Sequence, residues 1–154
     1  MKKAIVAALL GLVRCTNVFA LSQQSAIDQY LSGRKLDSVE GIWGNNYGNI
    51  NAIAKMGGSY SLIVIQHHIE RNGKHVGSLQ KSNENYYYGT SESYYGRSSY
   101  PCSFILKVSV NGNSASASCT DDRGYKLLFL YSRIWPADFI AHNAKFKTKK
   151  DVVK

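Results

Sequence analysis

Residues 102–120 constrain the fold of this chain more than any other segment. In residues 102–110 apolar side chains stand at every second position, which is the period of a β-strand with one buried face. Asn111 and Gly112 follow, and this pair favours the tight turn of a β-hairpin because both residues tolerate positive φ. Residues 114–120 alternate again, with Ala and Cys on one face and Ser on the other. The segment therefore predicts an antiparallel hairpin with one face in the core.

Similar patterns predict further strands along the chain. A second pair, Asn72-Gly73, predicts a hairpin that joins residues 59–71 to residues 74–80. Clear strand patterns cover residues 38–43, 59–70, 74–80, 102–110, 114–120 and 125–135, and weaker patterns cover residues 47–53 and 86–90. Sequential hairpins give an antiparallel up-and-down meander, and a meander that closes on itself removes its exposed edges. We therefore expect a mainly β fold, a small barrel or half-barrel of about seven or eight strands.

Short helices are expected on both sides of the strands. Residues 22–36 carry a helical apolar stripe behind a serine that can cap the helix, and Gly33 limits its length. Residues 136–146 begin with Pro136, a residue favoured at the first helical position. The first half of the strand at 59–70 is apolar on both faces, which indicates that it is covered on both sides.

Residues 1–20 have the pattern of a secretory signal peptide. Two lysines precede the apolar run 4–13, and the small residues Val18 and Ala20 occupy the positions that a signal peptidase recognises. The apolar run is shorter than the roughly 20 residues that span a bilayer. We therefore expect cleavage after Ala20, export to the periplasm or the medium, and a single β-barrel domain over residues 21–144.

The net charge of +9 gathers at the two ends of the chain. The signal segment carries three basic residues, and five of the other 16 lie in the basic tail, residues 145–154. Because residues 21–144 carry 11 basic and nine acidic side chains, nucleic acid is not an expected partner. The tail is expected to be a solvated extension, with contact to an anionic or membrane surface as the alternative.

Two cysteines, Cys102 and Cys119, follow the signal segment. An even number of cysteines in an exported chain predicts a disulfide. The Asn111-Gly112 turn sets a register in which Phe104 faces Cys119, so that Cys102 lies diagonally across the hairpin on the same face. Because a diagonal pair is distant for a disulfide, we expect a bulge or a strand end near Pro101.

Residues 83–100 are rich in tyrosine and allow two interpretations. In the first, a strand at 86–90 leads into a polar loop, and the rings lie across the barrel surface. In the second, the rings form an aromatic rim that contacts a ligand or a partner protein. The candidate binding residues in this tract are Tyr86, Tyr88, Tyr94 and Tyr95.

A metal site is a third possibility. On the expected 59–80 hairpin His68, Glu70 and His75 share one face, and these residue types suit zinc. The alternative, which we favour, is a hairpin tip whose polar side chains face water. We expect no cofactor.

Gly41-Ile42-Trp43 lies on the first expected strand, directly after the amino-terminal helix. It resembles the G-x-W motif that opens lipocalins and related calycin barrels. In that family the tryptophan closes one end of the barrel, and a basic residue of the last strand packs across its ring. The resemblance implies these structural roles for Gly41, Trp43 and Arg133. The chain also resembles a group of uncharacterised bacterial exported proteins, at residues 36–43, 89–90 and 133–136.

Two functions follow from these observations. The lipocalin resemblance implies an exported, non-enzymatic barrel that binds a small apolar or amphipathic ligand. The alternative is a secreted module that binds or inhibits another exported protein through the tyrosine-rich segment 86–100. The sequence contains no Ser/His/Asp, Cys/His or paired-carboxylate spacing typical of catalysis, so we expect binding rather than an enzyme.

Overall fold

The computed structural model describes residues 20–70, 72–95 and 97–146, without the side chain of Tyr95. Residues 1–19 of the expected signal peptide and residues 147–154 of the basic tail lie outside the described residues. No helix within the described part of the chain is both long enough and apolar enough to cross a membrane.

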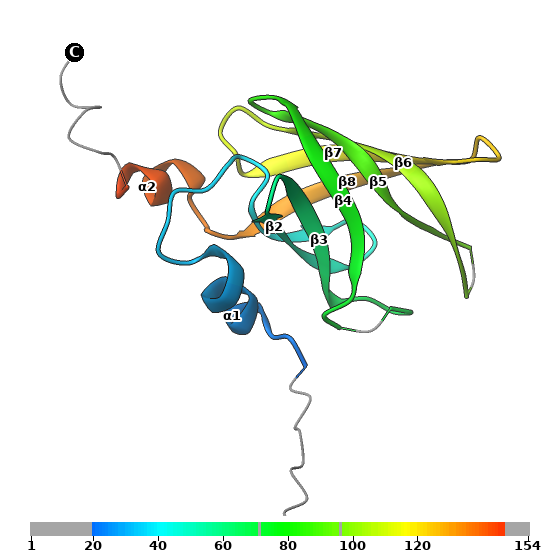
Figure 1. Cartoon of the computed structure of the whole chain (residues 1–154), viewed down its shortest axis with the longest axis horizontal. Coiled ribbons are helices and arrows are strands. Elements are labelled where there is room, and N and C mark those ends of the chain that lie inside the picture. Colours follow the sequence, from blue (N-terminus) through cyan, green and yellow to red (C-terminus); the bar gives the residue numbers. More distant parts are fainter. Residues whose placement is uncertain (1–19, 71, 96, 147–154) are drawn as a thin grey trace, which may run out of the picture.

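Eight antiparallel strands form a closed barrel in the order of the chain (Figure 1). The strands are β1 (Gly41–Asn45), β2 (Ile50–Met56), β3 (Ser59–Gln66), β4 (His75–Asn83), β5 (Tyr86–Tyr95), β6 (Ser98–Val108), β7 (Ser114–Asp121) and β8 (Lys126–Trp135). Each strand pairs with the next, and β8 pairs with β1. This confirms the expected mainly β fold and its up-and-down meander. The barrel has no exposed sheet edge.

The hairpin of β6 and β7 has the register that its turn predicts. Phe104 lies opposite Cys119, and the Asn111-Gly112 turn has Gly112 at a φ of 74°. The disulfide between Cys102 and Cys119 is present. The bulge expected beside it is absent, because the register runs unbroken along the paired residues and the two Cα atoms are only 5.4 Å apart. The twist of the sheet brings this diagonal pair within reach.

The second expected hairpin is present, since β3 pairs with β4, but its two-residue turn is wrong. Strand β3 ends at Gln66 and His75 lies opposite Ile63, so Asn72-Gly73 belongs to a longer connection between the two strands. The side chain of Asn72 bonds to the main chain of Leu21 and of Ile65, so its partners are tertiary contacts that a turn pattern does not reveal.

The polar loop expected after Thr90 is also wrong. Strand β5 continues to Tyr95 and pairs residue by residue with β6, ending at Tyr95 opposite Ser98. Serine and threonine lie between two groups of tyrosines here, and both kinds of side chain fit a strand once a long partner strand satisfies the main chain. Residues 86–95 of the tyrosine-rich segment are therefore part of the barrel wall.

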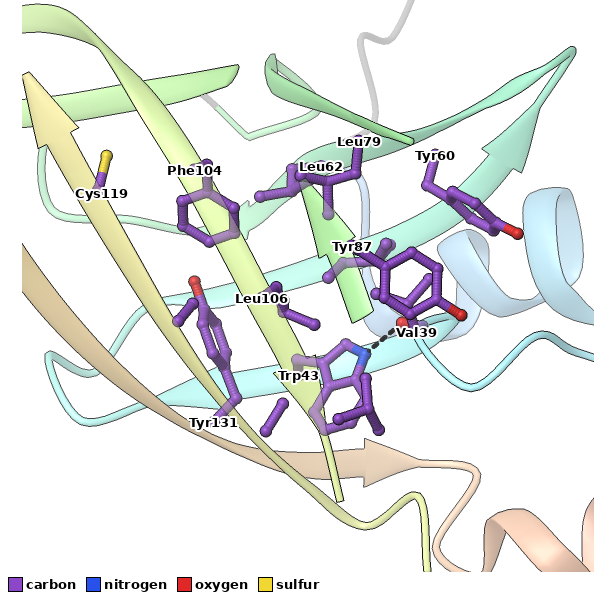
Figure 2. Packing of buried hydrophobic residues seen from close by; sticks show 14 of the residues in the cluster. Val39, Trp43, Tyr60, Leu62, Leu79, Tyr87, Phe104, Leu106, Cys119 and Tyr131 are labelled. Atoms are coloured by element: carbon purple, nitrogen blue, oxygen red, sulfur yellow. Dashed lines mark hydrogen bonds between the residues drawn. The ribbon is translucent and has the colours of Figure 1, made fainter. Parts of the chain in front are cut away.

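The barrel interior is filled mainly by large apolar side chains (Figure 2). They include Trp43, Tyr87, Phe104, Leu106 and Tyr131, which come from four different strands. Burial of this kind supplies most of the favourable free energy of folding.

A second core lies outside the barrel. The short helix α1 (Gln23–Ala26) and the π-helical turn η1 (Ile27–Leu31) pack on the outer face of β1, β2 and β3. The contact buries Ala26 and Leu31 against outward side chains such as Ile63. Strand β3 is thus covered on both faces, as its sequence predicts. The helical segment is shorter than the expected 22–36.

One end of the barrel is closed around Trp43, which is 1% exposed. Its indole N–H donates to the carbonyl of Val39 at 2.8 Å (Figure 2). The contact that the lipocalin resemblance implies is present, since the guanidinium carbon of Arg133 lies 4.0 Å from the centre of the Trp43 ring. The other face of the guanidinium lies 4.7 Å from the ring of Phe139.

Arg133 also donates to three main-chain carbonyls, those of Ser38, Glu40 and Gly112. Gly41 has a φ of 149°, and a Cβ there would collide with the Arg133 side chain and the Trp135 carbonyl. This explains the glycine of the motif in physical terms.

Helix α2 (Phe139–Ala144) supplies Phe139 to this closed end. It begins after Asp138, whose carboxylate accepts from the N–H of Ala141 at 2.9 Å, so Pro136 is not its first residue. The side chain of Asn143 bonds to both main-chain groups of Leu36, which ties the helix to the segment before β1.

Candidate functional site

A recess of about 460 Å³ opens at the barrel end opposite Trp43. We call it the mouth cup. Its volume lies within the range of small-molecule pockets, and most of its wall is aromatic or aliphatic. The lining residues are Tyr47, Asn49, His67, His68, Tyr94, Leu127 and Phe129.

The turn between β1 and β2 positions Tyr47 over the cup. The side-chain oxygen of Asn45 accepts from the main-chain N–H groups of Tyr47 at 2.9 Å and Asn49 at 3.2 Å. Gly48 supplies the positive φ, 78°, that the turn needs. The ring of Tyr47 then meets Phe129 edge to face, with the ring centres 5.4 Å apart.

His67 forms another part of the wall. Its Nδ1 accepts from the N–H groups of Ile69 at 3.1 Å and Glu70 at 3.0 Å, so the ring is neutral with its proton on Nε2. Burial lowers the pKa of His67, and the adjacent His68 lowers it further. The ring centre lies 4.6 Å from that of His68 and 4.7 Å from that of Tyr94.

Charged side chains link Glu70 and Lys74, in the loop between β3 and β4, to β5. The ammonium of Lys74 lies 2.8 Å from a Glu70 carboxylate oxygen and 3.1 Å from a Glu92 oxygen. The Tyr94 hydroxyl lies 3.1 Å from Glu70 and 2.9 Å from Glu92. The bond to Lys74 lowers the pKa of Glu70, whereas burial and the bond to Glu92 raise the pKa of Tyr94. These contacts hold Tyr94 and the adjacent loop in place at the edge of the cup.

A cavity of about 40 Å³ lies beneath the cup and shares four of its lining residues, Asn49, His67, Tyr94 and Phe129. It has room for one or two water molecules or for a small polar group. The other residues around it are Asn45, Asn51, Leu62, Val76, Ser91, Glu92, Phe104 and Tyr131. Further into the barrel the side chains of Trp43, Tyr87 and Leu106 fill the space. The site is therefore a shallow cup with a small polar cavity below it.

Two asparagines stand out in this cavity. Asn49 is 8% exposed and Asn51 is 7% exposed. Among the described residues neither side-chain amide has a hydrogen-bond partner, although each lines the cavity. Tyr131 is different, since its hydroxyl bonds to Asn45 and burial raises its pKa to about 12.

The four candidate tyrosines do not share one location in the structure. Tyr94 lines the cup. Tyr87 points into the barrel, so its neighbours Tyr86 and Tyr88 point outward, and Tyr88 is 51% exposed. The side chain of Tyr95 lies outside the described part of the chain.

The zinc candidates are placed as follows. His68 lines the cup, Glu70 bonds to Lys74, and His75 is exposed at the start of β4. Within residues 20–70, 72–95 and 97–146, no three His, Cys, Asp or Glu side chains form a group that could hold a metal ion.

The sequence did not indicate His67, Asn49, Asn51 or Phe129 as site residues. A signal for the asparagines exists, because counting back in twos from the inward Ile53 gives Asn51 and Asn49. The count requires a strand over residues 47–53. That strand pattern is weak because the region is rich in glycine and asparagine.

Comparisons of this chain with protein-family models, with curated proteins and with solved structures found no match. The closed antiparallel barrel of eight strands is compatible with a lipocalin-like small barrel.

Proposed function

We propose that this protein binds one small, largely apolar molecule in the mouth cup. The observation that carries the proposal is a recess of about 460 Å³ with aromatic walls at the open end of a rigid barrel. Tyr47, Tyr94 and Phe129 offer ring faces and edges to a flat ligand. Concave, mostly apolar recesses with a few polar groups are the usual sites for small molecules.

The depth of the site favours a compact ligand over a long acyl chain. A chain would have to enter the barrel axis, which Trp43, Tyr87 and Leu106 occupy. A bicyclic or similarly flat molecule fits the cup without displacing the core.

We propose binding without catalysis. A general base needs a free lone pair, but the Nδ1 of His67 accepts two main-chain N–H groups. The carboxylates of Glu70 and Glu92 both bond to Lys74, and this bond lowers the pKa of Glu70.

We further propose that the protein is exported and that its mature chain begins at Leu21. The disulfide fits an oxidising compartment. Asn72 holds both main-chain groups of Leu21, so the fold includes the residue directly after the expected cleavage point. Intact-mass measurement of the protein from its periplasm or medium would show a chain starting at Leu21. A mature chain that retains residues 1–20 would contradict this.

Binding is tested with a neutral fluorescent probe, phenylnaphthylamine, titrated into the whole mature protein. Tyr47→Ala and Tyr88→Ala are a matched pair, because both tyrosines are 51% exposed and only Tyr47 lines the cup. We expect Tyr47→Ala to weaken binding about tenfold, since it removes one aromatic wall. Tyr88→Ala should bind as the wild type does. Equal effects of the two substitutions, or no binding by the wild type, would overturn the proposal.

The second candidate function, binding of another exported protein, has its own observation. On the outer wall Tyr88 pairs with Ile105, and the exposed Leu128 of β8 lies in the same row two strands further on, beyond Ser118. Exposed apolar side chains grouped on one face are typical of interaction surfaces. The same two variants distinguish the functions, because a protein partner on this wall would be lost with Tyr88→Ala and kept with Tyr47→Ala. Native mass spectrometry of protein from its own source provides the readout.

A further inference from the structure

We infer that the molecule in the mouth cup is uncharged and carries a carboxamide-like group, which enters the small cavity and bonds to Asn49 and Asn51. This inference rests on the proposed function and specifies the chemistry of its ligand. It begins from two side chains that the fold itself leaves without partners.

The two asparagines are more than nine-tenths buried, at 8% and 7% exposure, and both line the cavity of about 40 Å³. Their amides are not sealed from solvent, because among the described residues only the Ser93 hydroxyl is both fully buried and without a partner; the unbonded amide atoms face the cavity, where an amide gains from a polar partner. The strands could hold apolar residues here, as β2 does at Ile53 two positions further on. Asn49 and Asn51 therefore act in binding a polar group, which is either water or part of a ligand.

The hydrogen-bonding groups around the cavity are of both kinds. Each asparagine offers a carbonyl acceptor and an NH₂ donor, and the neutral ring of His67 offers its Nε2–H. A partner that satisfies them needs a donor and an acceptor close together. A carboxamide has both in one planar group, whereas a ketone or an ether has only the acceptor.

The charges exclude an anion. No lysine or arginine is among the described residues that line the cup or the cavity, and the only carboxylate there is that of Glu92. Lys74 lies between Glu70 and Glu92, so its charge is already matched. A carboxylate in the cavity would lose its hydration without gaining a cation.

Three naphthalene derivatives, substituted at the same ring carbon, test the inference by calorimetry on the whole mature protein. They are the carboxamide, the carboxylate and the acetyl ketone, which have nearly the same shape. We expect the carboxamide to bind about tenfold more tightly than the ketone, because the ketone lacks the donor. We expect it to bind about 100-fold more tightly than the carboxylate, whose charge has no partner.

The variant Asn51→Leu then tests whether Asn51 causes the tighter binding of the carboxamide. It should leave ketone binding within about twofold and remove the advantage of the carboxamide, since it deletes one polar partner and keeps the volume. Asn85→Leu, at the closed end of the barrel, is the control and should keep the full preference. A thermal melt of each variant shows that it is folded.

The outcomes separate the inference from the proposed function. Equal binding of carboxamide and ketone by the wild type means that the asparagines hold water only, and the inference fails while the cup remains a binding site. Tighter binding of the carboxylate also overturns it. If none of the three probes binds, and phenylnaphthylamine does not bind either, the proposed function fails as well. The three probes are compared on the wild-type protein, so this test remains valid even if a variant does not fold.

Discussion

The two ends of the barrel differ in the hydrogen bonding of their largely buried polar side chains. At the closed end the guanidinium of Arg133 lies between two aromatic rings and donates to three carbonyls. Nearby, the fully buried carboxylate of Glu40 accepts from Arg34 at 2.6 Å and from the N–H of Lys55 at 2.7 Å. At the open end the side-chain amides of Asn49 and Asn51 face the small cavity without a hydrogen-bond partner among the described residues.

This difference assigns separate tasks to the two ends. A buried polar group that has all its hydrogen bonds stabilises one arrangement of the chain, whereas a buried group without them destabilises it. Natural proteins retain buried polar groups without partners mainly at functional sites, although such groups lower stability. The closed end therefore stabilises the fold, and the open end is the place to look for a ligand.

The largest expected effect is at the closed end. Trp43→Ala should lower the free energy of unfolding by about 3–5 kcal/mol, because it removes a large buried ring and the surface against which Arg133 lies. Urea unfolding measures the change. A loss below about 1 kcal/mol would mean that Trp43 does not close the barrel.

The disulfide links β6 and β7 in the barrel wall between the two ends. Replacing both Cys102 and Cys119 with alanine should cost about 3 kcal/mol, since the bond closes a short loop of the unfolded chain. Urea unfolding under oxidising conditions measures this loss. Wild type with added reductant is the control and should lose a similar amount, and an unchanged midpoint in both cases would contradict the prediction.

A smaller effect is expected from acid at the open end. The pKa of His67 is below its usual 6.5 because of burial and His68, so the unfolded chain binds a proton more readily than the folded one. Its contribution to stability is complete above about pH 6.5 and is lost as the pH falls from there toward the lower folded pKa. Glu70, whose pKa is also lowered, adds a loss of the same sign below its usual 4.5.

Urea unfolding at about pH 7.5 and about pH 5.5 measures this loss of stability. The variant His67→Gln, which does not titrate, should lose less stability between the two pH values than the wild type does. Other charged or titratable groups that act on His67 are His68, Glu70, Lys74 and Glu92. His68→Gln removes the smaller of the two causes and should therefore reduce the loss less than His67→Gln does, and an equal pH dependence in all three proteins would show that His67 is not responsible.

The smallest effect is expected on the outer wall. Leu128→Ser should change the free energy of unfolding by less than about 0.5 kcal/mol, because the leucine is 60% exposed and belongs to neither core. Thermal unfolding measures the difference, with the inward neighbour Phe129→Ser as the damaging comparison. A large loss for Leu128→Ser would show that the outer wall also supports the fold.

Local patterns predicted the wall of the barrel well. Every expected strand is present, the Asn111-Gly112 turn predicted the register of β6 and β7, and the even number of cysteines predicted the bond between Cys102 and Cys119. The same kind of pair, Asn72-Gly73, predicted a two-residue turn between β3 and β4, where the connection is in fact longer. The difference is that Asn111 bonds within its own hairpin, whereas Asn72 bonds to Leu21, which is 51 residues away.

The candidate site was predicted only in part. Of the four tyrosines proposed as binding residues, Tyr94 lines the cup, while Tyr86 and Tyr88 point away from the interior. His67 was not distinguished from its neighbour His68, because their roles depend on which ring nitrogen meets the main chain of Ile69 and Glu70.

The sequence by itself determined the strands, the antiparallel order, the disulfide and the tryptophan end of the barrel. These follow from alternation, from turn residues and from a short motif, all of which act over a few neighbouring positions. The tertiary structure decided that eight strands close completely, that large side chains fill the axis, and that Asn49 and Asn51 are left without partners. The physical reason is that burial and hydrogen-bond satisfaction depend on side chains from strands far apart in the sequence, which meet only when the barrel closes.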